Sequence, residues 1–237
     1  SWDVSSVTDM AGMLGASSFN QDLSSWDVSS VTDMSNMFLY ANALSDENQC
    51  AIHTSFSSNQ NWPYDWSGLC PLIFQPQNTE ELQTAVDLWV DDNATALANY
   101  GEINTWDVSL ITDMSYLFYN KTTFNDDISG WDVSNVIDMT SVLRNAESFN
   151  GDISGWDVSS VTNMKDMLRE TTNFNQDLSI WDVSSVINMD AIFHTTSSFN
   201  GDISTWDVSN VTKMESMFWS ANAFNGDISS WDMSSVT

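Results

Sequence analysis

The stretch Trp156-Asp157-Val158-Ser159-Ser160-Val161-Thr162 decides the fold, because near-copies of it recur along the chain. From Trp106 onward the tryptophans that open the copies are 25 residues apart, and Trp2 and Trp26 are one residue closer. A fixed period of this length is typical of stacked supersecondary units, each of which contacts its neighbours, rather than of a globular core. The other copies begin at Trp2, Trp26, Trp106, Trp131, Trp181, Trp206 and Trp231.

One unit combines two apolar periodicities. The pattern Ile153-x-x-Trp156-x-Val158-x-x-Val161 has the spacing of the strand segment of a leucine-rich repeat, and Trp156 and Val158 alternate with polar neighbours. From Val161 to Leu168 apolar residues recur at i, i+3, i+6 and i+7, which predicts a helix of two turns. We therefore expect an α/β solenoid with about 25 residues per repeat, each contributing one short parallel strand and one short helix.

Stacking such units places equivalent residues in continuous columns. The chain has 12 tryptophans and 12 methionines, and their registration with the repeat indicates core packing rather than a cofactor site. A column of asparagines is expected to form a ladder of amide hydrogen bonds to turn backbone. Its members are Asn125, Asn150, Asn175, Asn200 and Asn225.

The run F-N-[GQD]-D-[IL]-S-x-W-D-V-S-[SN]-V-[TI]-x-M covers most of the chain and resembles the repeat of BspA-like leucine-rich-repeat proteins. It is also similar to the repeat of unknown function in mycoplasma-type surface lipoproteins. The resemblance implies a secreted or surface-displayed solenoid used for adhesion, binding or scaffolding. The family offers no common catalytic residues to carry over.

The repeats fall into two stretches, separated by an interval without them. We expect two arrays joined through caps, because a repeat array needs its terminal apolar layers covered. The expected segments are the last two repeats of a first array (1–44), its disulfide-clamped C-terminal cap (45–70), a linker (71–77), the N-terminal capping helix of a second array (78–105) and that second array, truncated (106–237).

The caps carry their own signals. Cys50 and Cys70 bracket a loop in the interval, which predicts a disulfide and an oxidising compartment; two reduced, buried thiols are the alternative. In the second cap, Asn78 is placed to begin a helix and Glu81 to complete a capping box.

Composition limits the partners. The chain has 33 acidic and 5 basic residues and a net charge of −28, which argues against nucleic acid and anionic membrane surfaces. The balance favours solubility, cation binding or both. No run of about 18 apolar residues occurs, so we expect no membrane insertion. An extracellular or cell-surface location is predicted.

Catalysis is not expected. The two histidines, His53 and His194, fall in different arrays without partners at a suitable spacing. No glycine-rich phosphate loop, H-E-x-x-H or C-x-x-C motif occurs. We therefore predict a protein that is not an enzyme and has no organic cofactor.

Two columns of aspartates recur with the repeat. Bare carboxylates about 4.8 Å apart repel by roughly 1 kcal/mol per pair in water, so hydroxyl and backbone donors, raised pKa values or cations should offset the repulsion. Calcium is the candidate cation. Its candidate ligands are Asp107, Asp132, Asp157, Asp182, Asp207 and Asp232. The second column is expected to satisfy turn amides and comprises Asp127, Asp152, Asp177, Asp202 and Asp227.

Three sequons permit N-glycosylation without arguing for it, in a chain rich in asparagine, serine and threonine. They begin at Asn93, Asn120 and Asn210.

Two functions follow. The first is a non-enzymatic structural or adhesive segment of a surface fibre or matrix filament, which assembles laterally or end to end with itself or binds other extracellular proteins or glycans. The alternative is a cell-surface receptor whose Asp/Ser strand face binds a ligand with calcium. Residues 1–8 and 230–237 are the same octet with one substitution, so a super-repeat of about 229 residues in a longer fibre is expected; a receptor of two arrays is the other interpretation.

Overall fold

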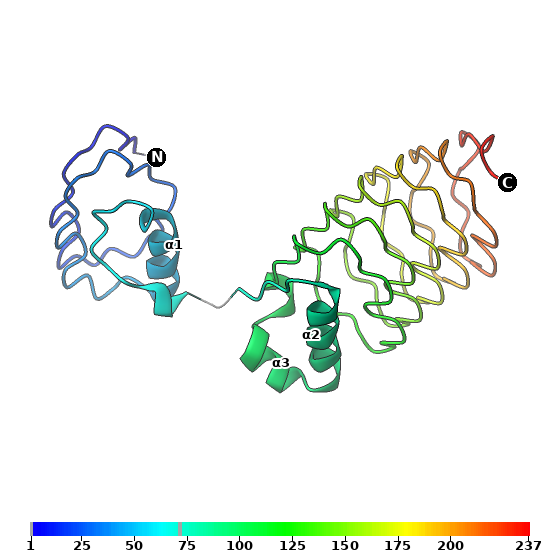
Figure 1. The fold of residues 1–237 in the computed structure, drawn as a ribbon, viewed down its shortest axis with the longest axis horizontal. Helices are drawn as coiled ribbons and strands as arrows, with labels where there is room; N and C mark the ends of the chain where they lie inside the picture. The colour runs from blue at the N-terminus through cyan, green and yellow to red at the C-terminus, as the bar shows by residue number, and fades with distance from the viewer. Residues whose placement is uncertain (1, 71–72) are drawn as a thin grey trace. The chain divides into compact units, whose positions relative to one another are not determined.

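The computed structural model describes residues 2–70 and 73–237, so Pro71 and Leu72 of the expected linker lie outside the described residues. The chain divides into two compact units, residues 1–72 and 73–237, each of which is described by itself (Figure 1). Each unit combines stacked repeats with a helical cap.

Unit 1 is closed by helix α1 (Asp46–Phe56) and the 3-10 turn η1 (Ser67–Leu69). The hydroxyl of Ser45 accepts the N–H of Asn48 and thereby caps α1, whose buried face carries Ile52 and Phe56. Aromatic rings pack edge to face over the last repeat, as in the pair Phe56 and Trp62 with ring centroids 5.3 Å apart. The cap therefore covers the apolar end of the array.

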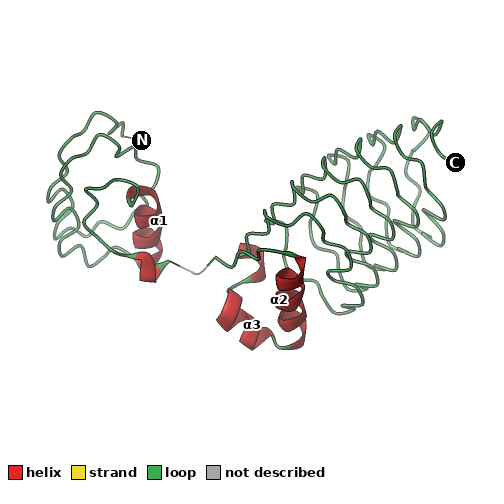
Figure 2. Cartoon of the chain, in the orientation of Figure 1, coloured by secondary structure: helices red, strands yellow, loops and turns green. Residues whose placement is uncertain are grey.

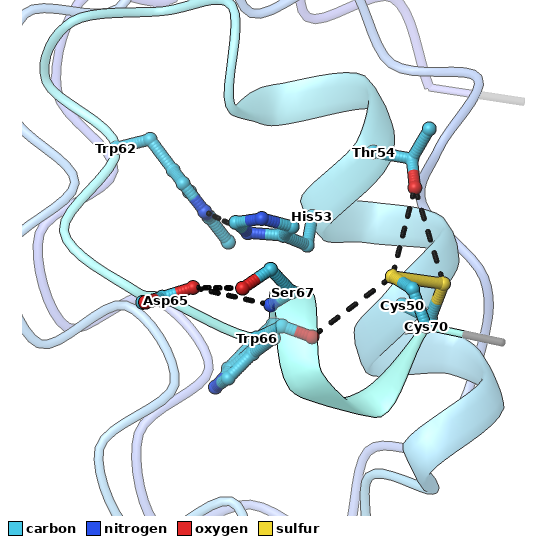
Figure 3. Close-up of a disulfide and its surroundings, with 8 residues drawn as sticks. All are labelled: Cys50, His53, Thr54, Trp62, Asp65, Trp66, Ser67 and Cys70. Atoms are coloured by element: carbon cyan, nitrogen blue, oxygen red, sulfur yellow. Dashed lines mark hydrogen bonds between the residues drawn. A yellow bond between two sulfur atoms is a disulfide. The ribbon is translucent and has the colours of Figure 1, made fainter. Parts of the chain in front are cut away.

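A disulfide closes this cap. Cys50 on α1 is bonded to Cys70, which follows η1, with their Cα atoms 4.8 Å apart (Figure 3). The hydroxyl of Thr54 lies 3.9 Å and 3.8 Å from the two sulfur atoms. The predicted disulfide is present, and it ties the aromatic loop to the helix.

Unit 2 begins with helices α2 (Thr79–Asp91) and α3 (Asn93–Tyr100) and the 3-10 turn η2 (Ile103–Thr105). Asn78 accepts the N–H of Glu81 at 2.9 Å, and the Glu81 carboxylate accepts the N–H of Gln77 at 2.8 Å. The expected single capping helix is thus a pair of helices, with the Asn78 cap where the sequence predicts it.

The repeats contain neither of the elements expected of them. In the part of the chain that the structure describes there is no strand, and the three α-helices lie outside the repeats (Figure 2). Among the described residues, β-type pairing between neighbouring repeats is limited to isolated parallel bridges, such as that between Asp138 and Asn163. The prediction of an α/β solenoid with a strand and a helix in each repeat is therefore wrong.

Backbone conformation explains the missing helices. Two residues in each repeat, four positions apart, have positive φ, for example Ser141 at 55° and Asn145 at 57°. An α-helix requires φ near −63°, so either residue interrupts it. The positions recur at Tyr116, Ser141, Asp166, Ala191 and Ser216, and at Asn120, Asn145, Glu170, Thr195 and Ser220.

The segment forms instead a chain of turns, here called the turn ribbon: residues 114–120, 139–145, 164–170, 189–195 and 214–220. Within a ribbon, alternate N–H groups bond three residues back, as from Val142 to the carbonyl of Met139 at 3.2 Å. The others bond to the next repeat, as from Leu143 to the carbonyl of Met167 at 3.0 Å. Half of the bonds that a helix would make internally therefore join neighbouring repeats.

The expected strand is absent for a related reason. The N–H of Trp156 donates to the carbonyl of Ile153 at 3.1 Å, and the N–H of Val161 donates to that of Val158 at 2.9 Å. These groups close turns within one repeat and so cannot pair with the next repeat in a ladder.

Side-chain columns fill the core. The rings of Trp206 and Trp231 stack with centroids 6.2 Å apart, and those of Phe149 and Phe174 do so at 6.2 Å. The predicted asparagine ladder is confirmed: the N–H of Asn175 donates to Oδ1 of Asn150 at 2.9 Å, and the bond repeats along the column. Apolar stacking and amide bonding thus hold the repeats in one register.

Helix α2 completes the first repeat of unit 2. Its Thr79 hydroxyl donates to the carbonyl of Asp113 at 2.6 Å, and one turn later the Gln83 amide donates to the carbonyl of Leu117 at 3.0 Å. The carbonyls at the same positions in later ribbons accept N–H groups from the preceding repeat. The cap therefore supplies side-chain donors where a preceding repeat would supply backbone.

None of the helices within residues 2–70 and 73–237 combines the length and apolarity that crossing a bilayer requires.

Candidate functional site

The first aspartate column bonds to its own turns. Oδ1 of Asp157 accepts the N–H of Ser159 at 3.1 Å and its hydroxyl at 2.6 Å. Every member of the column accepts the N–H two residues on, as Asp107, Asp132, Asp157, Asp182, Asp207 and Asp232. Of the three ways to offset carboxylate repulsion, the structure has local hydrogen bonding.

These bonds set the direction of the pKa shifts. The hydroxyl and then the N–H of Ser159 hold the pKa of Asp157 below its ordinary value, because both stabilise the ionised carboxylate. The serine two residues on likewise lowers the pKa of Asp107, Asp182, Asp207 and Asp232. In these five aspartates the pKa shift is therefore downward, opposite to the alternative of raised pKa values.

The second aspartate column satisfies turn amides, as predicted. Asp152 accepts the N–H of Ser154 at 3.0 Å, and Asp177 accepts that of Ser179 at 2.8 Å. The same bond occurs at Asp127, Asp202 and Asp227. Both columns are thus part of the scaffold.

In residues 2–70 and 73–237, no group of three or more His, Cys, Asp or Glu residues is arranged to hold a metal ion. Calcium binding by the first aspartate column stays a prediction.

The sequons lie at exposed residues. Asn93 opens helix α3, and Asn120 accepts an amide bond from Asn145 at 2.7 Å. The side-chain amide of Asn210 donates to the carbonyl of Ser184 at 2.8 Å. Asn120 and Asn210 therefore already take part in contacts between repeats.

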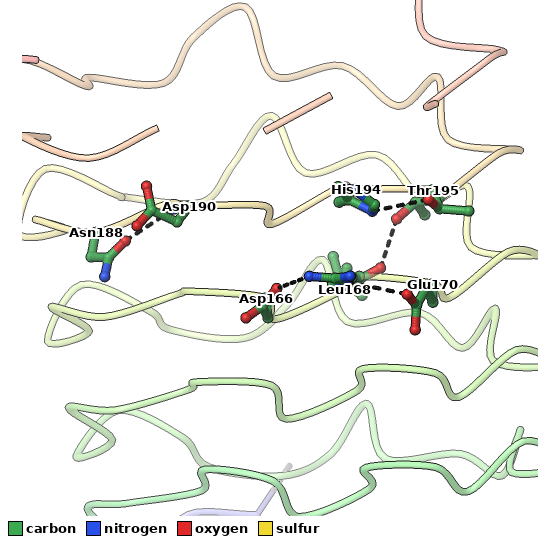
Figure 4. Close-up of polar contacts among 9 residues, drawn as sticks. Asp166, Leu168, Glu170, Asn188, Asp190, His194 and Thr195 are labelled. Carbon is green, nitrogen blue, oxygen red and sulfur yellow. Dashed lines mark hydrogen bonds and ion pairs between the residues drawn. The ribbon is translucent and has the colours of Figure 1, made fainter. Parts of the chain in front are cut away.

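The two histidines have structural partners. Nδ1 of His53 accepts the indole N–H of Trp62 at 3.1 Å inside the cap (Figure 3). Nδ1 of His194 bonds to the hydroxyl of Thr195 at 2.9 Å (Figure 4). Each histidine is thus part of its local fold.

The residues on the outer side of the turn ribbons change from repeat to repeat, in contrast to the aspartate and asparagine columns. One register position of the turn ribbon holds a planar side chain in each of five repeats. These residues are Tyr119, Arg144, Arg169, His194 and Trp219. The guanidinium of Arg144 lies 5.4 Å from the ring centre of Tyr119, and the rings of His194 and Trp219 stack at 6.4 Å. We call this set the planar column.

The basic residues gather here as well. All five lie on or directly beside turn ribbons, in a chain of net charge −28. Arg169 pairs with Asp166 and with Glu170 at 3.2 Å each, and Lys121 pairs with Asp87 of α2 at 2.8 Å. The full set is Lys121, Arg144, Lys165, Arg169 and Lys213.

A hollow opens in this surface over Ala191. Figure 4 shows three of its lining residues, Asp166, Asp190 and His194, on neighbouring repeats. At the equivalent register, the preceding ribbon has Asp166 and the next has Ser216, so the short alanine leaves room between larger neighbours. The hollow has a volume of about 230 Å³. It is lined by Lys165, Asp166, Arg169, Asp190, Ala191, His194, Glu215 and Ser216.

Sequence reasoning missed this surface because it assigned the segment to a helix and looked for function in repeated residues. The available signal lay in the positions that vary between repeats, not in those that recur. Positions that stacking does not fix carry Tyr, Trp and Arg, the residue types enriched at binding hot spots.

Comparison with known families gives one match. The family described as a Mycoplasma protein of unknown function, DUF285, matches residues 1–62, 86–184 and 152–237. Neither the curated proteins nor the solved structures contain a significant match.

Proposed function

This chain belongs to the DUF285 family of Mycoplasma proteins of unknown function, and we propose that it is a non-enzymatic structural and adhesive protein of the cell surface. In this proposal the repeated columns form a scaffold, and the turn ribbons present the residues that contact other molecules. The finer resemblance to BspA-like surface repeats supports the same role.

One observation carries the proposal: the repeated polar side chains already form hydrogen bonds within the repeat array. Asparagines bond along their column, and aspartates bond to the serines of their own turns, as Asn150 and Asp157 illustrate. The asparagine bonds join neighbouring repeats and hold them in register, whereas the aspartate bonds stay within one repeat and occupy carboxylate oxygens that a ligand would need. The Asp/Ser face is therefore the weaker candidate for recognition.

The extracellular location rests on the disulfide between Cys50 and Cys70, because such bonds persist in oxidising surroundings. The net charge of −28 keeps chains apart in solution, so lateral assembly would need local contacts such as those of the turn ribbons.

Immunogold labelling of intact cells that express the gene tests the location. We expect label on the surface without permeabilisation and its loss after brief protease treatment. Labelling that requires permeabilisation would refute a surface role. Beads coated with the purified chain, applied to cells or matrix, test adhesion separately.

A further inference from the structure

We propose that the hollow over Ala191 binds a neutral sugar unit of a glycan, which deepens the adhesive function proposed above by naming the chemistry of its partner. Three successive repeats build the hollow, and no repeated column requires its residues.

The hollow has a firm base. Ala191 is 7% exposed and is held in the left-handed region at φ 54° by ribbon bonds on both sides. Its N–H donates to the carbonyl of Glu215, and its carbonyl accepts from His194. Oδ1 of Asp190 accepts the N–H of Glu215 at 2.8 Å, which fixes that carboxylate at the rim. The site is therefore largely preformed.

Its charges are mixed and nearly balanced. Lys165 and Arg169, from one repeat, supply donors, whereas Asp190 and Glu215, from the next two, supply acceptors. Asp166 is 6% exposed and bonds to the guanidinium of Arg169 at 3.2 Å, so part of the positive charge is already compensated. A ligand in the hollow meets donors and acceptors together.

This mixture selects against ions. An anion would use only the donors and would be opposed by Asp190, Glu215 and the chain's net charge of −28. A cation would be opposed at short range by Lys165 and Arg169. A hydroxyl group both donates and accepts, so a ligand with several hydroxyls can satisfy both sets of groups at once.

The surroundings favour a sugar ring among hydroxyl-bearing ligands. The ring of His194 beside the hollow can meet the C–H face of a pyranose, while the polar groups meet its rim. The planar column continues from His194 through Arg169 and Arg144 to Tyr119. Further sugar units of the same glycan can pack along it, and several weak contacts on one chain strengthen binding.

The test is a titration of the isotopically labelled 237-residue chain with methyl glycosides, in which binding is measured by changes in the NMR chemical shifts of the backbone amides. The neutral probes are the methyl glycosides of glucose, galactose, mannose and N-acetylglucosamine. The charged comparators are methyl glucuronide and methyl glucosaminide. We expect at least one neutral glycoside to bind with a Kd on the order of 1 mM and with higher affinity than both charged comparators. Its binding should shift the amide signals of residues 165–169, 190–194 and 215–216.

Variants locate the site. Lys165→Met and Glu215→Gln should each weaken binding about tenfold, because each removes a charged hydrogen-bonding group. Lys213→Met and Glu147→Gln make the same changes outside the hollow and should stay within about twofold. Ala191→Asp should abolish binding and still fold, since Asp166 occupies the same register at φ 54°; circular dichroism checks the fold.

The proposal is overturned if no neutral glycoside binds, if glucuronide or glucosaminide binds more tightly, or if the shifts lie away from the hollow. Equal losses in the test and control variants would also overturn it. These outcomes are separate from the surface labelling, so a failed titration leaves the adhesive function to its own test.

Discussion

The indole nitrogen of Trp156 donates a hydrogen bond of 3.1 Å to the carbonyl oxygen of Ile128, which lies 28 residues earlier in the preceding repeat. The same bond recurs at Trp131, Trp181 and Trp206, so each tryptophan both fills the core and secures its neighbour.

Replacing Trp156 by Phe removes this donor and leaves the Ile128 carbonyl with the N–H of Trp131 as its remaining partner. We expect Trp156→Phe to lower the free energy of unfolding by about 1–2 kcal/mol, measured by urea denaturation, because a hydrogen bond is lost and the smaller ring fills the core less well. Trp219→Phe is the control, because Trp219 is 65% exposed; its effect should stay below about 0.5 kcal/mol. Equal effects of the two variants would contradict this role of the indole bond.

Gly201 lies directly against the backbone of the preceding repeat. A Cβ at this residue would overlap the carbonyl oxygen of Gln176, which is backbone and cannot move aside. Gly201→Ala should therefore destabilise unit 2 by about 1–3 kcal/mol. A Cβ on Gly155 would meet nothing within 4 Å, so Gly155→Ala should be neutral or stabilise by about 0.4–1 kcal/mol. Thermal unfolding of both variants tests the contrast.

Acid should destabilise the repeats. The pKa of Asp157 is lowered in the folded state by Ser159, so the unfolded chain takes up its proton first as the pH falls. The stabilisation is complete above about pH 4, the ordinary aspartate range, and is lost as the pH falls through the lower folded pKa. Chemical denaturation from pH 7 to pH 2 should show stability falling with acid. A rise in stability on acidification would indicate crowded, repelling carboxylates instead.

Ser159→Ala isolates one of these contacts. Because the variant keeps the N–H donor and removes the hydroxyl, the pKa of Asp157 should move up toward its ordinary value. Side-chain NMR titration measures the shift, and Asp182 serves as the internal reference.

Reduction of the disulfide should act on unit 1 alone. The bond joins residues 20 apart, for which the chain-entropy model predicts about 3 kcal/mol of stabilisation. With reductant, hydrogen exchange should accelerate in residues 2–70 and stay unchanged in residues 73–237. The Cys50→Ala, Cys70→Ala double variant should exchange like the reduced protein and should not respond to reductant. Acceleration in both units would contradict the separation.

Calcium binding by the aspartate columns has a direct test. If the Asp157 column binds the ion, added calcium should raise the Tm and EDTA should reverse the rise, following RT ln(1 + [L]/Kd) for each site. Oδ1 of Asp157 already accepts two hydrogen bonds from Ser159, so a bound ion would compete with these donors. A Tm that neither calcium nor EDTA changes would rule out calcium binding by this column.

The sequence predicts the stacking partners better than the backbone that carries them. Trp156, Phe174 and Asn150 recur at one period, and equivalent residues meet because each repeat rests on the next. Burial leaves a mark in sequence that does not depend on the type of secondary structure. The side-chain columns and the asparagine ladder were therefore predictable.

The turn ribbon was not predictable from the same pattern. Apolar residues at Val161, Met164, Met167 and Leu168 suit a helix, yet a succession of four-residue turns buries the same positions. A glycine in the sequence usually indicates left-handed backbone. Here Asp166 and the other residues at its register position adopt this conformation, because ribbon bonds on both sides fix them. Because the candidate site lies on the turn ribbon, it could not be predicted either.

The row of stacked indoles is also an array of coupled chromophores. Trp181, Trp206 and Trp231 lie nearly parallel, with successive centroids 6.3 Å and 6.2 Å apart and interplanar angles of 3° and 4°. Electronic transitions of identical rings at such separations mix, which splits and intensifies the ultraviolet circular dichroism bands. The protein thus carries an intrinsic optical signal of contact between repeats. This signal would weaken when neighbouring repeats separate, even if each repeat kept its own turns.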